Sequence, residues 1–164
     1  MNFMKIDRYD LHILDILQSD GRISNQDLAA RIGLSPAPCL RRVRALEEAG
    51  IIQGYRAIVA PERLGLGLLA LVHIAMDRHT PERFAGFEAA VAELPQVIEC
   101  LLITGQQADY QLKVLARDMA DYQDILLHHL TRIEGVSGVH TSFVLRRSPA
   151  RAIMANAMAA AHSV

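Results

Sequence analysis

Residues 33–50 of this 164-residue chain read GLSPAPCLRRVRALEEAG, and this stretch decides how the first third of the protein folds. Ser35 is a typical helix N-cap, and Pro36 suits the first helical position because an N–H there would have no helical partner. Gly50 follows as a residue that commonly ends a helix. The stretch therefore predicts one helix that begins at Ser35-Pro36.

Two further helices are predicted before this one. Asp7 is a candidate N-cap for a first helix that continues to the stop signal Ser19-Asp20-Gly21. Ser24 and Asp27 form a variant of the capping box for a short second helix, which Gly33 ends. Because so tight a turn joins the second and third helices, the pattern indicates a helix-turn-helix.

Three arginines follow the start of the third predicted helix. At about 100° per residue, Arg41 lies almost opposite the apolar side of this helix, Arg44 flanks Arg41, and Arg42 lies nearer the apolar border. A guanidinium can bond to guanine edges or clamp a phosphate, and the helix N-terminus also favours phosphate. The residues predicted to contact DNA are Ser24, Asn25, Ser35, Pro36, Ala37, Pro38, Arg41, Arg42 and Arg44.

An alternative for these arginines is a solvated helical face, with Arg44 in reach of Glu47 and Glu48 one turn on. We favour DNA contact because the arginines follow a capped short helix and a tight turn. The formal net charge is −1, so DNA binding has to come from such a local patch.

Hydrophobicity and cysteine spacing indicate where in the cell the protein is found and whether it contacts a membrane. The longest uncharged apolar run, residues 64–76, is shorter than the roughly 20 residues of a membrane helix, and residues 1–7 lack an apolar signal core. Cys39 and Cys100 form no CxxC pair, which fits two reduced thiols. We therefore expect a cytoplasmic protein without a membrane partner.

The second half of the chain predicts an α+β domain. Its expected strands cover residues 68–76, 97–104, 110–116 and 139–145, and its expected helices run from Thr80-Pro81 to Leu94 and from Asp118 to Gly135. This β-α-β-β-α-β order is ferredoxin-like, with both helices on one face of an antiparallel sheet. Residues 51–59 are expected to be a strand that joins a partner subunit rather than a wing.

These features predict a domain organisation in four parts. They are a DNA-binding domain (6–54), a linker strand and hinge (55–66), a ferredoxin-like domain (67–147), for which the resemblance described next implies effector binding and assembly, and an alanine-rich tail (148–164).

The runs at residues 20–24, 33–44 and 46–55 resemble the Lrp/AsnC (feast/famine) family of transcriptional regulators, and weaker resemblance continues to residue 147. The resemblance implies that the second half is a RAM domain, which binds an amino-acid effector and builds dimers, often octamers. It implies an effector held between dimers, near Thr104-Gly105. Two copies of the third helix would then read a pseudo-palindromic operator with half-sites about one helical turn apart.

The predicted effector contacts lie around one loop, and they are Leu102, Thr104, Gly105, Gln106, Gln107, Asp109 and Tyr110. Members of the family commonly read Gly-x-x-Asp-Tyr here, whereas this chain has one residue more between Gly105 and Asp109. Without the resemblance, residues 105–109 form an ordinary polar hairpin loop.

Two other classes of function stay open. Ferredoxin-like domains also occur in enzymes, but no acid, base and nucleophile converge in this sequence. An architectural DNA binder without a ligand is the second alternative. No cofactor or metal is expected, because the adjacent His128 and His129 point about 100° apart on a helix and no HExxH or Cys/His cluster is present.

Overall fold

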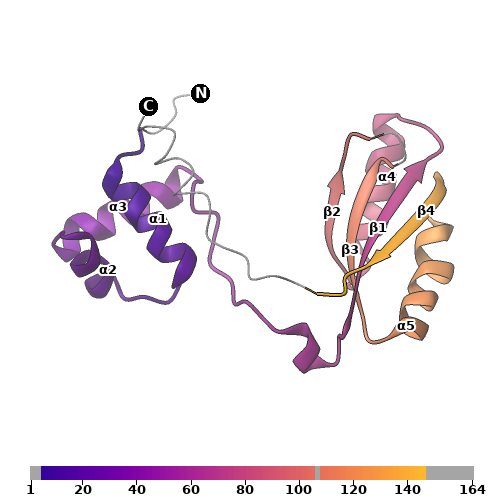
Figure 1. Ribbon diagram of the computed structural model, residues 1–164. Helices are drawn as coiled ribbons and strands as arrows, with labels where there is room; N and C mark the ends of the chain where they lie inside the picture. The colour runs from indigo at the N-terminus through magenta and orange to yellow at the C-terminus, as the bar shows by residue number, and fades with distance from the viewer. Residues whose placement is uncertain (1–4, 106–107, 147–164) are drawn as a thin grey trace. The chain divides into compact units, whose positions relative to one another are not determined.

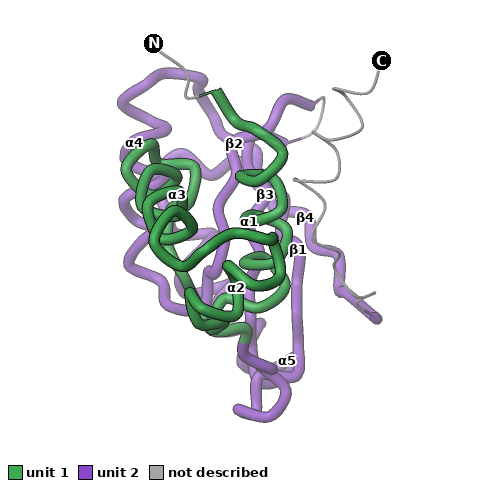
Figure 2. Tube along the Cα trace, turned by 90° about the vertical axis from the view of Figure 1, so that its left-hand side faces the viewer, with its two compact units in different colours: residues 1–58, 149–164 green, residues 59–148 purple. Residues whose placement is uncertain are grey.

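The computed structural model describes residues 5–105 and 108–146. These residues divide into two compact units, of which one ends at Ile58 and the other begins at Val59 (Figure 2). The predicted alanine-rich tail lies outside the described residues. No helix among the described residues has the length and apolar character needed to cross a membrane.

The first unit consists of three helices, α1 (Arg8–Ser19), α2 (Asn25–Ile32) and α3 (Pro36–Glu48) (Figure 1). Asp7 caps α1 in a capping box with Asp10, and Gly33 ends α2 with a φ of +72°. The helices enclose a small core whose buried members are Ile13, Leu28, Ala29, Ile32, Cys39 and Leu46. The predicted helix-turn-helix is therefore confirmed, and it begins and ends where the caps indicated.

The segment after α3 differs from its prediction. Residues 51–60 contain no strand in the single chain, and Ile58 is 98% exposed. A strand needs a neighbouring strand to satisfy its N–H and C=O groups, and no other segment of the described chain supplies one here. Pairing of this segment with a partner subunit stays a prediction.

The second unit contains the predicted β-α-β-β-α-β order. A 3-10 turn (Pro61–Leu64) precedes β1 (Leu68–Met76), α4 (Pro81–Ala92), β2 (Val97–Leu102), β3 (Tyr110–Ala116), α5 (Met119–Asp124) and β4 (Val136–Phe143). The four strands form one antiparallel sheet in the order β2-β3-β1-β4. This topology confirms the ferredoxin-like architecture.

One face of the sheet carries the main core. Alternate residues of β1 and β3 point to this face, where they pack against Phe87 of α4 and against Tyr122 and Ile125 of the last helical segment. Both helices therefore lie on the same side of the sheet, as predicted. The opposite side carries His73 and Lys113, and no described helix covers it.

The last helix and three strand ends depart from the predicted boundaries. After Asp124 the chain makes a π-helical turn (Ile125–His129) and then a 3-10 turn (Leu130–Arg132). The wider turn brings Ile125 and Leu130, five residues apart, into one core, which α-helical spacing would not do. β2 stops at Leu102 instead of residue 104, and β4 covers Val136–Phe143 instead of residues 139–145.

Candidate DNA-binding and effector sites

The outer face of α3 carries two exposed arginines. Arg41 and Arg44 point to solvent, whereas Cys39 and Leu46, on the opposite side of the helix, are fully buried. Neither arginine makes an ion pair with a described residue. α3 therefore presents two guanidiniums that can meet an anionic surface.

The glutamates at the end of α3 do not pair with Arg44 within the described part of the chain. Instead, Glu47 accepts a hydrogen bond of 2.9 Å from the Tyr55 hydroxyl. Burial, together with this bond, raises the pKa of Tyr55. The Arg44–Glu47 and Arg44–Glu48 pairs, which were expected if the arginines formed only a solvated helical face, are therefore not formed.

Arg42 has a different environment from its neighbours. Its Nη1 lies 2.8 Å from Asp10 Oδ1 and 2.9 Å from Asp7 Oδ2, and its guanidinium lies over the Tyr9 ring. The hydrogen bond with Asp10 is the largest influence on the pKa of Arg42, which is raised. Since Asp10 is only 2% exposed, Arg42 neutralises a buried carboxylate and ties α3 to the start of α1. This placement differs from the expected phosphate contact.

The predicted polar contacts at the turn divide into two kinds. Ser24 caps α2, because its hydroxyl accepts from the Asp27 amide and donates to the Asp27 carboxylate. Asn25 donates to the carbonyl of Pro36 at 2.9 Å and so joins α2 to α3. Ser35 occupies the N-cap position of α3 without a side-chain cap bond, and its exposed hydroxyl is left at the positive end of that helix.

The first turn of α3 presents small apolar groups beside Ser35. Pro36 and Ala37 are exposed, and Pro38 is half-buried. Small side chains let a helix approach the floor of a groove, and an alanine methyl can contact the methyl group of thymine. This turn therefore fits the tip of a recognition helix.

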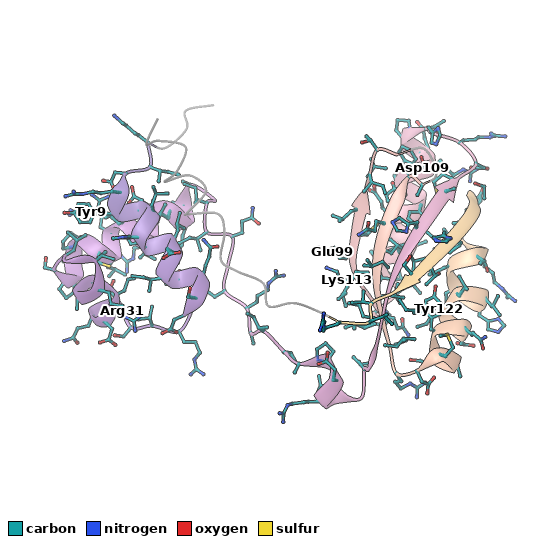
Figure 3. All side chains as sticks on the ribbon, viewed as in Figure 1. Tyr9, Arg31, Glu99, Asp109, Lys113 and Tyr122 are labelled. Carbon is teal, nitrogen blue, oxygen red and sulfur yellow. The ribbon has the colours of Figure 1, made fainter. Side chains whose placement is uncertain are left out.

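In the second unit, Asp109 fixes the connection between β2 and β3. Its Oδ2 accepts a hydrogen bond of 2.7 Å from the Met76 amide, and its own amide donates to the Ile74 carbonyl at 2.8 Å. Its carbonyl accepts from the Ile103 amide. Asp109 therefore has a fixed position at the end of the sheet where β1 finishes (Figure 3).

His79 meets the other oxygen of this carboxylate. Its Nε2 lies 2.7 Å from Asp109 Oδ1, and its ring centroid is 6.0 Å from that of Phe84. The sequence offered no signal for this contact, because the two residues are far apart in the chain and share no motif. They meet because β1 and β3 are antiparallel neighbours, with Ile74 opposite Tyr110.

The remaining predicted effector residues are not equivalent. Thr104, Gly105 and Leu102 are exposed near the end of β2, whereas Tyr110 is fully buried and its hydroxyl donates to Glu88 at 2.8 Å. Burial first, and then Glu88, raises the pKa of Tyr110 well above its ordinary value. Tyr110 is therefore a core residue whose ring is held in place. Gln106 and Gln107 lie outside the described residues.

Beside this end of the sheet lies a hollow of about 370 Å³ between α4 and β2. Its wall is mostly apolar and includes Val91, Val97, Cys100, Leu102 and Tyr110. Among the described residues, no three His, Cys, Asp or Glu side chains gather in a way that could hold a metal ion.

Comparison with known proteins gives matches over both units. Residues 6–53 match the model of the winged helix-turn-helix DNA-binding family, and residues 69–152 match the Lrp/AsnC ligand binding domain. The leucine-responsive regulatory proteins of Escherichia coli K12 and Salmonella typhimurium are each 46% identical over 140 residues, which cover 85% of this chain and 85% of each relative.

Solved structures agree with these matches. A Neisseria meningitidis transcriptional regulator in complex with L-Met has a TM-score of 0.85 and 37% identity, covering 90% of this chain and 94% of that one. AsnC of E. coli has a TM-score of 0.81 and 28% identity, covering 90% and 97%. These relatives are regulators rather than enzymes. The chain therefore belongs to the Lrp/AsnC family of transcriptional regulators, with a helix-turn-helix DNA-binding domain followed by a ligand-binding domain.

Proposed function

We propose that this regulator binds a pseudo-palindromic operator as a dimer, through Arg41 and Arg44 of α3. The observation that carries this proposal is the exposure of both guanidiniums, without an ion-pair partner among the described residues, directly after the turn that joins α2 to α3. Ser35 adds a hydroxyl and a helix N-terminus that suit a phosphate. Arg42 supports the position of α3 from inside the domain.

The ligand of the second unit is proposed to be an amino acid that binds near Thr104, Gly105 and Asp109, with Gln106 and Gln107 as further candidates from sequence. The Neisseria relative solved with L-Met supports the ligand class. The chemistry also fits, because Asp109 supplies a carboxylate for an ammonium group and Leu102 borders an apolar hollow. Binding would shift the protein between assemblies and so alter DNA affinity.

Assembly is proposed to start with a dimer and to continue to an octamer, in the cytoplasm where the operator lies. Support for a dimer comes from the sheet face that no described helix covers, on which Leu101 is 45% exposed. Exposed Ile58 and Val59 add apolar surface in the preceding segment.

The DNA proposal is tested with Arg41→Ala and Arg44→Ala on a fragment of DNA from upstream of the protein's own gene. Each loss of a bidentate base contact costs about 1–3 kcal/mol, or about 5- to 150-fold in affinity. Arg63→Ala removes an equal charge from an exposed position outside α3 and serves as the matched control. Gel-shift titration with light scattering measures binding and assembly together. Unchanged binding in both α3 variants would refute the role of this helix.

A further inference from the structure

We propose that His79 occupies the point on Asp109 where the ammonium group of the effector binds, so that the effector must displace the imidazole. The inference rests on the proposed amino-acid site and adds a competitor that the chain itself supplies. No described residue of the DNA-binding unit takes part in it.

The two oxygens of Asp109 have different partners. Oδ2 accepts from the Met76 amide, which belongs to the backbone of β1 and holds the carboxylate in place. Oδ1 lies 2.7 Å from His79 Nε2. A ligand that displaces a side chain leaves the sheet intact, so Oδ1 is the oxygen that a ligand can take.

The imidazole can leave this position at small cost. The His79 side chain is 67% exposed, whereas that of Asp109 is 22% exposed. A polar contact with one partner this exposed contributes little stability, because solvent screens it and both side chains lose freedom. His79 therefore lowers the affinity for an ammonium group by a modest factor without blocking the site.

Charge makes the competition selective. The neighbouring carboxylate of Asp77 is bound by Arg83, which also binds Glu134, and Arg78 is an exposed cation on the same loop. Asp77 already has a cation as its partner, and Asp109 is the carboxylate that contacts the His79 imidazole. An ammonium group and the His79 imidazole therefore compete for the same oxygen, Oδ1.

The test compares His79→Ala with the full-length wild-type protein by calorimetric titration of L-methionine and L-leucine. His79→Ala is expected to bind an amino acid about two- to fivefold more tightly, which is the size of a solvent-screened polar contact. 4-(Methylthio)butanoic acid, which is methionine without its ammonium group, should bind both proteins equally. If His79→Ala bound this analogue more tightly than wild type, by the same factor as it gains for methionine, competition for the ammonium site would be refuted.

Two control variants separate this inference from the proposed site. Asp109→Asn keeps an oxygen for the Met76 amide but loses the charge, so amino-acid affinity should fall; His128→Ala, an exposed histidine elsewhere, should change nothing. If Asp109→Asn weakens amino-acid binding and His79→Ala binds with wild-type affinity, the role of His79 as a competitor is refuted, whereas the proposed amino-acid site is supported. If wild type, His79→Ala and Asp109→Asn all fail to bind either amino acid, the proposed site is wrong and the inference falls with it.

Discussion

The two units are stabilised in different ways. The helical unit has six buried side chains in its core, whereas the sheet unit has thirteen. The charged residue that is buried among the described residues, Asp10, belongs to the smaller unit, where Arg42 neutralises it. A small unit buries too little apolar surface to be strongly stable, so one ion pair carries a larger share of its stability. The sheet unit depends instead on apolar packing.

The largest expected effect is in the core of the sheet unit. Phe87→Ala removes a fully buried ring that packs 4.6 Å, centroid to centroid, from Tyr110, and should lower the free energy of unfolding by about 3–5 kcal/mol. Residue-resolved hydrogen exchange should show the loss in β1 and β3 and leave α1 to α3 protected. Leu145→Ala, at a position that is 98% exposed, is the control. Equal loss in both units would show that they unfold together.

The next effect is specific to the helical unit. Arg42→Ala leaves Asp10 buried without its cation and should cost about 2–3 kcal/mol, measured by the same exchange experiment. Arg41→Ala, the adjacent exposed arginine, should change stability by less than about 0.5 kcal/mol. A similar result for both variants would mean that the ion pair does not stabilise the unit.

The second ion pair of Arg42, with Asp7, predicts a response to pH. Burial raises the pKa of Asp7, but hydrogen bonds from the Asp10 and Tyr9 amides and from Arg42 outweigh it, and the net pKa is lowered. A lowered folded-state pKa contributes stability above the unfolded value of about 3.9, and this is lost as the pH falls through the folded value. The unfolding midpoint of wild type should therefore decrease below about pH 4 more than that of Arg42→Ala.

A smaller effect is expected at a glycine of the sheet unit. Gly135 has a φ of +93°, and a Cβ there would collide with Arg83, which is tied to Asp77 and Glu134. Gly135→Ala should lower stability by about 1–2 kcal/mol in urea unfolding. Gly86→Ala, in the middle of α4 with open space around it, should raise stability by about 0.5–1 kcal/mol. A neutral Gly135→Ala would show that Arg83 moves aside freely.

Structural features that depend on residues close together in the chain could be predicted from the sequence, and features that depend on distant residues could not. The helix-turn-helix could be predicted because Asp7, Ser24, Gly33 and Pro36 act on their own helix ends. The strands β1 and β3 could be predicted because they are bounded by turn residues and rich in apolar and β-branched side chains.

Contacts between distant residues could not be predicted in the same way. The Arg42–Asp10 pair depends on how α3 crosses α1, and the His79–Asp109 pair depends on the register of β1 with β3. Helical periodicity placed Arg42 at the apolar border correctly but could not show that a carboxylate lies there. The one-residue departure after Gly105 gave no indication that a histidine contacts Asp109.

The two cysteines give the chain a chemical reporter of its own. Cys39 is fully buried in the helical unit, and Cys100 is exposed in the sheet unit. Desolvation raises the pKa of both thiols, so the difference between them is access: an alkylating reagent cannot reach Cys39 in the closed unit. Labelling of Cys39 therefore has to wait for the three helices to open. The labelling rate of Cys39, measured relative to that of Cys100, therefore reports how often the helical unit opens. A slower rate in the presence of operator DNA would show that DNA binding suppresses this opening.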